Sequence, residues 1–197
     1  MGNPSWDVLI IGDGSGSGWD TSCGWCGLLI DKQTRGRRYA YGGMNAGSVN
    51  FAESMPYIQL ISWYDANGGK ARLKEQGTLN IHILTDSQVV AHWGNRAVAS
   101  SVDLPRKHIM LWAGLRELRR LGYMCTFHWS PRMTTQANWA CDLIAGLTRR
   151  EVLSASEPGS VAGNASQRAA TVIANMKLYD PETGQELHPH SINRDIV

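Results

Sequence analysis

The feature that most constrains the fold of this chain is its series of five short apolar segments. These segments are 6–13, 24–31, 37–43, 79–85 and 123–129. Glycine-rich or polar turns join the first three, which predicts an antiparallel meander. Helical periodicity follows over 51–66, 86–98, 106–121 and 136–149, and Pro56 falls in the expected first turn of the first helix. The order β-β-β-α-β-α-α-β-α predicts an α/β fold, a five-stranded mixed sheet with helices on both faces.

Composition and length bound the organisation of the chain. Its 197 residues, 43% of them hydrophobic, suffice for one compact domain. From residue 151 onward the residues become small and polar, so we expect one domain over 1–150 and a linker and tail over 151–197. A contact with a protein partner is one open interpretation of this tail.

Several classes of protein are excluded by simple patterns. No apolar run approaches the roughly 18 residues that span a bilayer, and the N-terminus lacks the pattern of a secretory signal, so we expect a soluble cytoplasmic protein without membrane contact. The four cysteines are too few for a disulfide scaffold, and we expect them to be reduced. Cys23 and Cys26 have the spacing of a metal knuckle, but strand positions three apart face opposite sides, which favours a structural role.

The distribution of charge is more informative than the net charge of +2. Residues 101–150 carry eight basic and three acidic side chains. Arg116, Arg119 and Arg120 lie on the expected outer face of the helix over 106–121. This excess is consistent with a phosphate-facing surface, although a solvated helix face gives the same count and is the commoner explanation.

Four carboxylates occupy positions where an unpaired charge is costly. Asp13 ends the first apolar strand and Asp86 follows the fourth, so the two are side by side if those strands are neighbours. Glu53 lies in the expected first turn of the helix after the meander, and Asp142 lies on the last helix. Each alone has an ordinary explanation as a cap, a dipole partner or a surface residue. Together they would repel one another unless cations bound between them.

The chemistry of such a cluster is specific. Hard oxygen ligands favour Mg²⁺ or Mn²⁺, and Mg²⁺ commonly takes substrate phosphate oxygens as further ligands. Two ions about 4 Å apart activate a water and stabilise the leaving oxygen of an in-line displacement. The four carboxylates therefore predict phosphodiester hydrolysis.

Four motifs in order carry a resemblance to a known family. They are IIGDGSGSG followed by GWCGLLI, then NFAES, LTDSQVV and HWSPRMTTQANWACDLIAG. Over about residues 6–148 these segments resemble the type 1 ribonuclease H family. The resemblance implies the ribonuclease H-like fold and an endonuclease that cuts the RNA strand of RNA/DNA hybrids, leaving 5′-phosphate and 3′-hydroxyl ends.

The resemblance also implies roles for individual residues. Asp13, Glu53, Asp86 and Asp142 would be catalytic and would bind two Mg²⁺ ions, with Mn²⁺ as a substitute. Asn50 and Gln88 would contact the hybrid near the 2′-hydroxyls that distinguish RNA. Further substrate contacts are expected from Gly14, Ser15, Ser87 and Asn138.

Two departures from the family pattern affect the expected mechanism. Bacterial members carry a mobile histidine in the loop before the last helix, where this chain has Arg132. Arginine does not shuttle protons near neutral pH, so a catalytic Arg132 would hold a phosphate and turnover would be slower or gated differently. The basic protrusion of several members is mostly absent between Val98 and Arg106.

Alternatives of other kinds stay open. One is another nuclease of the same superfamily, such as a junction resolvase or an exonuclease, which a substrate panel would distinguish. A second is a non-catalytic nucleic-acid-binding module, which loss of metal binding would favour. Trp19 and Trp139 are candidates for stacking on bases, although core packing is the usual role of tryptophan.

Overall fold

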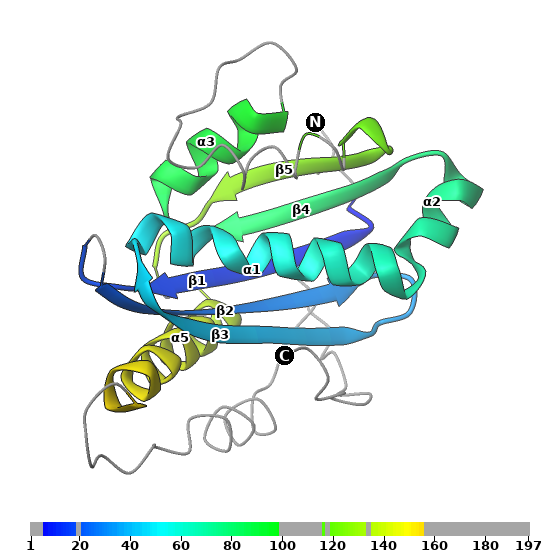
Figure 1. Ribbon diagram of the computed structural model, residues 1–197. Helices are drawn as coiled ribbons and strands as arrows, with labels where there is room; N and C mark the ends of the chain where they lie inside the picture. The colour runs from blue at the N-terminus through cyan, green and yellow to red at the C-terminus, as the bar shows by residue number, and fades with distance from the viewer. Residues whose placement is uncertain (1–5, 19–20, 99–115, 117–118, 133–134, 156–197) are drawn as a thin grey trace.

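The computed structural model describes residues 6–18, 21–98, 116, 119–132 and 135–155 (Figure 1). Its five strands are β1 (Val8–Ser15), β2 (Thr21–Asp31), β3 (Arg37–Gly47), β4 (Leu79–Thr85) and β5 (Tyr123–Trp129). They form one sheet in the order β3-β2-β1-β4-β5. The pairs β1–β2 and β2–β3 are antiparallel, while β1–β4 and β4–β5 are parallel. The predicted mixed sheet with its antiparallel meander is confirmed.

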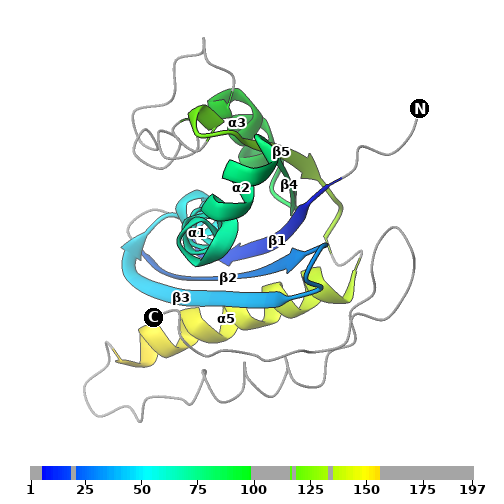
Figure 2. The same cartoon turned by 90° about the vertical axis from the view of Figure 1, so that its right-hand side faces the viewer.

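Helices cover both faces of this sheet. They are α1 (Val49–Tyr64), the π-helical turn η1 (Asp65–Gly69), α2 (Lys70–Gln76), α3 (Gln88–Val98) and α5 (Gln136–Ala155). Figure 2 shows α1 on one face of the sheet and α5 on the other, along β2 and β3. The expected helix over 106–121 and the segment between Val98 and Arg106 lie mostly outside the described residues. Among the described residues, no helix combines the length and apolar character needed to cross a membrane.

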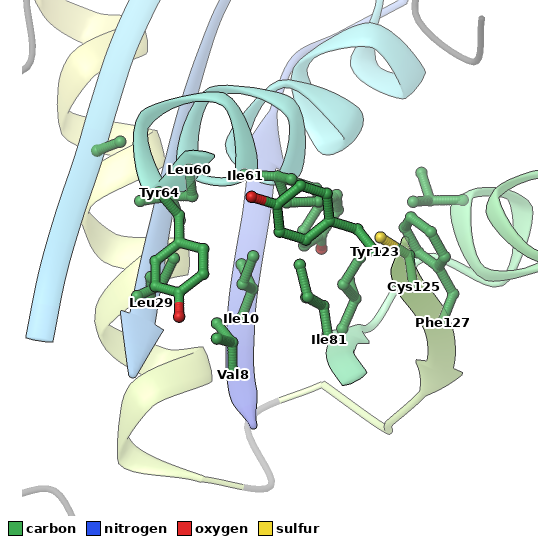
Figure 3. Packing of buried hydrophobic residues seen from close by; sticks show 14 of the residues in the cluster. Val8, Ile10, Leu29, Leu60, Ile61, Tyr64, Ile81, Tyr123, Cys125 and Phe127 are labelled. Carbon is green, nitrogen blue, oxygen red and sulfur yellow. The ribbon is translucent and has the colours of Figure 1, made fainter. Parts of the chain in front are cut away.

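The alternation of side chains along the strands divides the core into two clusters. On the α1 face, Ile10 and Ile81 pack with Leu60, Ile61 and other apolar residues of that layer (Figure 3). The second cluster lies between the opposite face and α5. Cys23 belongs to the first cluster and Cys26 to the second, and all four cysteines are free and buried. The opposite facing of the two cysteines confirms the structural interpretation.

The expected start of α1 is wrong. The helix begins at Val49 and is capped by Ser48, whose Oγ accepts a hydrogen bond from the Phe51 N–H at 3.2 Å. Pro56 therefore lies inside the helix instead of in its first turn, despite the usual cost of proline there. Its ring packs on two paired glycines: a Cβ added to Gly12 or Gly27 would lie 2.8 or 2.7 Å from the Pro56 Cβ.

The glycine-rich ends of the first three strands extend further than expected. Segments assigned to loops continue the ladder, with Gly14 paired to Trp25 and Ser15 paired to Gly24. These glycines provide close contact between layers. A Cβ on Gly24 would lie 2.2 Å from the Ala145 carbonyl oxygen, where α5 crosses β2. The composition that suggested turns instead permits helices to pack directly on the strands.

Two helical segments also differ from the expectation. The last helix continues past Arg149 to Ala155, and Val152 packs on β3, where a Cβ on Gly43 would lie 2.5 Å from its Cγ2. The segment after α1 contains a second helix, α2, reached through a kink at which Gly68 has φ +117°. The domain boundary at 150 and the role of the tail stay predictions, and residues 156–197 lie outside the described part.

Helix α2 contributes a partly buried ion network at the start of β1. Arg72 contacts Asp31 at 3.0 Å and Asp7 at 3.1 Å, and the Tyr64 hydroxyl donates to Asp31 at 2.8 Å. Asp31 pairs with Val8, so this network stabilises the edge of the sheet opposite the end of β1 that carries Asp13.

Candidate metal centre

Three of the four predicted carboxylates meet at one edge of the sheet. Strands β1 and β4 are parallel neighbours with Ile11 opposite Leu84, so Asp13 and Asp86 emerge at the same carboxyl edge. Glu53 reaches this edge from α1. One carboxylate oxygen from each of the three residues lies within 4.8 Å of the other two. This spacing is short enough for a shared cation.

Close contact between β1 and α1 creates this arrangement. Gly14 is buried under the helix, and a Cβ there would lie 2.3 Å from the Glu53 backbone nitrogen and 2.5 Å from the Ala52 carbonyl carbon. One turn further along α1, the Tyr57 hydroxyl donates to the Gly12 carbonyl at 2.9 Å and lies 3.4 Å from the Leu84 carbonyl. The helix is thereby fixed to both strands that carry the aspartates.

Burial makes ionisation of these acids unfavourable. Asp13 is 4% exposed, and burial, followed by the charges of Asp86 and Asp142, raises its pKa to about 7. The Gly14 N–H, which donates to Asp13 Oδ1 at 2.7 Å, acts in the opposite direction. Burial and then the charge of Asp13 raise the pKa of Glu53 to about 9, and burial also raises that of Asp86. Near neutral pH, protons therefore remain in the cluster.

The donor set fits a hard divalent cation. All three groups are carboxylates, the ligand type preferred by Mg²⁺ and Mn²⁺. Glu53 Oε2 is buried and has no hydrogen-bond partner within the part of the chain that the structure describes. Such an oxygen is costly in the native state unless a cation or proton satisfies it. A divalent ion would replace the bound protons and remove this cost.

The fourth carboxylate is connected through an arginine. Asp142, on α5, is not within the group of three and forms an ion pair with Arg132. The Arg132 Nε also lies 3.6 Å from Asp86 Oδ2. The arginine side chain is 64% exposed, so it borders the cluster at the solvent side. Its positive charge lowers the pKa values of Asp13, Glu53 and Asp86.

The predicted substrate contacts lie around this edge in differing environments. Gln88 is exposed at the start of α3, Asn50 is half-buried in the first turn of α1, and Ser15 is half-buried at the end of β1. Ser87 accepts from the Val90 N–H at 3.3 Å and so caps α3, while the Asn138 side chain accepts from Thr135 at 2.6 Å. Their contacts with nucleic acid stay predictions.

Two residues of the site were missed by the sequence analysis. Tyr57 is four residues after Glu53 and therefore lies on the same face of α1, a spacing that identifies it as a neighbour of the cluster. Trp129 ends β5, and its Nε1–H donates to the Asp86 carbonyl at 3.0 Å. No sequence pattern indicates this second contact, since it depends on the parallel pairing of β4 with β5.

Solved structures that are similar to this chain in three dimensions include ribonucleases H. The N-terminal RNase H domain of rv2228c from Mycobacterium tuberculosis matches with a TM-score of 0.56 and 16% identity, over 78% of this chain and 100% of that chain. RNase H1 from the halophilic archaeon Halobacterium salinarum matches with a TM-score of 0.50 and 19% identity, over 73% of this chain and 98% of that chain. The chain has the ribonuclease H fold.

A third ribonuclease H structure was solved with nucleic acid bound. LC11-RNase H1, isolated from compost by a metagenomic approach, was solved in complex with an RNA/DNA hybrid and matches with a TM-score of 0.52 and 14% identity. The match covers 75% of this chain and 99% of that chain. No protein-family model and no curated protein matches the sequence. The ribonuclease H fold expected from the four motifs is confirmed by three-dimensional similarity.

Proposed function

We propose that this protein is a ribonuclease H, a metal-dependent endonuclease that hydrolyses the RNA strand of RNA/DNA hybrids. The observation that carries the proposal is the meeting of Asp13, Glu53 and Asp86 within 4.8 Å at the carboxyl edge of β1 and β4. The complex of LC11-RNase H1 with an RNA/DNA hybrid, a structure of the same fold, supports the choice of substrate.

The residues of the cluster have distinct roles in this proposal. Asp13, Glu53 and Asp86 would hold two Mg²⁺ ions, for which Mn²⁺ would substitute, and Asp142, which is paired with Arg132, would be the fourth ligand. Bound divalent ions would activate a water and stabilise the leaving oxygen of the phosphodiester, which gives 5′-phosphate and 3′-hydroxyl products. Cation binding would displace protons from Asp13 and Glu53, because their pKa values are raised to about 7 and about 9.

Arg132 and two amides position the substrate. Arginine stays charged at all working pH values, so Arg132 binds a phosphate oxygen and does not transfer protons. It is exposed beside both Asp86 and Asp142, where a scissile phosphate must lie. The amides of Asn50 and Gln88, near the starts of α1 and α3, accept and donate hydrogen bonds to the 2′-hydroxyls of the RNA strand.

A cleavage assay with one matched variant tests the proposal. Purified protein with Mg²⁺ is expected to cut an end-labelled RNA/DNA hybrid, Asp86→Asn to abolish cleavage, and Glu75→Gln, an exposed acid on α2, to retain it. A panel of double-stranded DNA, double-stranded RNA and four-way junctions separates this activity from that of a resolvase or an exonuclease. Equal cleavage by Asp86→Asn would refute the proposal, and failure to bind Mn²⁺ in calorimetry would favour a non-catalytic module.

A further inference from the structure

Two exposed tryptophans lie next to the carboxylates. Trp129 is 49% exposed and Trp139 is 47% exposed. Trp129 is held beside the cluster by its hydrogen bond to the Asp86 carbonyl. Trp139 lies in the first turn of α5, three residues before Asp142, so both side chains lie on the same face of that helix.

Core packing does not explain either tryptophan. Neither belongs to the two hydrophobic clusters among the described residues, whereas Trp63 and Trp93 pack against the first. Among the large hydrophobic side chains that are exposed in the described part of the chain, these two are the aromatic ones. Large aromatic surface left in water beside a polar site indicates a binding role.

One arginine is paired with the two acids that neighbour these tryptophans. Arg132 is paired with Asp86, next to Trp129, and with Asp142, next to Trp139. The rim of the site therefore carries an aromatic, a cationic and a second aromatic side chain in spatial order. This combination is typical of surfaces that bind single-stranded nucleic acid, where bases stack on rings and an arginine contacts the backbone.

A tryptophan ring stacks only on a base whose face is free. Inside a duplex both faces of a base are covered by its neighbours, so a continuous hybrid offers these rings little to stack on. We propose that Trp129 and Trp139 bind unpaired nucleotides that adjoin the cleaved hybrid, so that the substrate class is a hybrid flanked by a single-stranded segment. This inference rests on the proposed function of the same site and adds the structure of the substrate to it.

The expected effect is large enough to measure. Stacking of one base on an aromatic side chain contributes about 1–3 kcal/mol, which corresponds to an affinity change of about 5- to 150-fold. A hybrid with an unpaired extension should therefore bind more tightly than the same hybrid with blunt ends by a factor in this range.

Fluorescence anisotropy with labelled blunt and extended hybrids tests the proposal, with Ca²⁺ in place of Mg²⁺ so that binding is measured apart from cleavage. Trp139→Leu keeps an apolar side chain but removes the flat ring, and should lose most of the preference for the extended hybrid. Trp139→Phe should restore part of it, and Trp129→Phe should retain a ring without the hydrogen bond to Asp86. Leu153→Ala, an equally exposed apolar residue at the far end of α5, should keep the full preference.

The outcomes separate this inference from the proposed function. Equal affinity of the unmodified protein for blunt and extended hybrids, or an unchanged preference in Trp139→Leu, would refute the inference even if the protein cleaves hybrids. A preference that depends on Trp139, in a protein that cleaves no hybrid, would support the inference while refuting the proposed nuclease. Calorimetry with Mn²⁺ on each variant checks that the carboxylate cluster is intact.

Discussion

Replacing Gly14 with alanine tests whether the close contact of β1 with α1 creates the carboxylate cluster. The added Cβ would lie 2.3 Å from the Glu53 nitrogen and 2.5 Å from the Ala52 carbonyl carbon, whereas ordinary contacts begin at 3.4 Å. Both neighbours are backbone atoms, so no rotation of a side chain relieves the overlap. Helix α1 must move by about 1 Å, and overpacking of this kind costs about 1–3 kcal/mol of stability.

The same displacement affects metal binding. Metal ligands must be held to within about 0.5 Å, so a shift of about 1 Å in Glu53 exceeds the tolerance of the site. We expect the free energy of unfolding of Gly14→Ala to fall by about 3 kcal/mol, the upper end of this range, because the overlapping atoms are backbone atoms that cannot move away by a change of rotamer. We expect its Mn²⁺ affinity to fall by about 10- to 100-fold, as when groups that support metal ligands are removed.

Urea unfolding followed by circular dichroism, together with Mn²⁺ calorimetry, measures both effects. The matched control is Gly146→Ala, in α5, where an added Cβ has no atom within 4 Å. The free energy of unfolding of this control should rise by about 0.5–1 kcal/mol, because alanine favours the helix more than glycine does, and its Mn²⁺ affinity should stay the same. A Gly14→Ala protein with the original unfolding midpoint and affinity would refute the reasoning.

Three further predictions follow from the charges. Mn²⁺ affinity should rise with pH, by up to about 100-fold per pH unit below pH 7 and by about tenfold per pH unit from pH 7 to pH 9, because binding displaces protons from Asp13 and Glu53, whose pKa values are about 7 and about 9. A pH-independent calorimetric affinity would contradict this. In EDTA, the free energy of unfolding should fall as pH rises above the ordinary pKa values of 3.8 and 4.5 and until it reaches about 9, because over this range the folded state holds protons on Asp13 and Glu53 that the unfolded state has lost. A free energy of unfolding that rises with pH in urea titrations would exclude this. Arg72→Met should lower the free energy of unfolding by about 2–4 kcal/mol, because it leaves Asp7 and Asp31 without their cation. Its Mn²⁺ affinity should not change, since the carboxylate cluster lies at the opposite edge of the sheet. An unchanged free energy of unfolding in urea would contradict this prediction.

Connection lengths permit the pairing of β1 with β4, and with it the proximity of Asp13 and Asp86, which the structure confirms. Short turns between the first three apolar segments require antiparallel pairing, and a helical connection before the fourth permits a parallel one. Carboxyl ends of adjacent parallel strands lie at the same edge, so residues at those ends become neighbours. The place of Glu53 in the cluster was expected from the resemblance of the NFAES motif to the ribonuclease H family.

The ends of the strands and helices were not predictable, because a glycine in a sequence can mark either a turn or a close contact between two layers. Gly14 was interpreted as a loop residue from composition, yet it lies in a paired strand where a helix passes too closely for a side chain. Gly68, by contrast, has a positive φ and does mark a turn. Local sequence does not distinguish the two cases, since only the neighbouring layer determines whether a Cβ would fit.

The separation of Asp142 from the other three acids was also not predictable, because the sequence gives no reason to distinguish Asp142 from them. The structure pairs Asp142 with Arg132, which also lies beside Asp86, so one guanidinium partly neutralises these two acids. Asp13 and Glu53 are more deeply enclosed and have their pKa values raised to about 7 and about 9. An entering cation therefore competes with an arginine for one pair of acids and with protons for the other. Because the Arg132 charge also lowers the pKa values of Asp13 and Glu53, removing this charge should free Asp86 and Asp142 and at the same time shift the pH dependence of metal binding to higher pH.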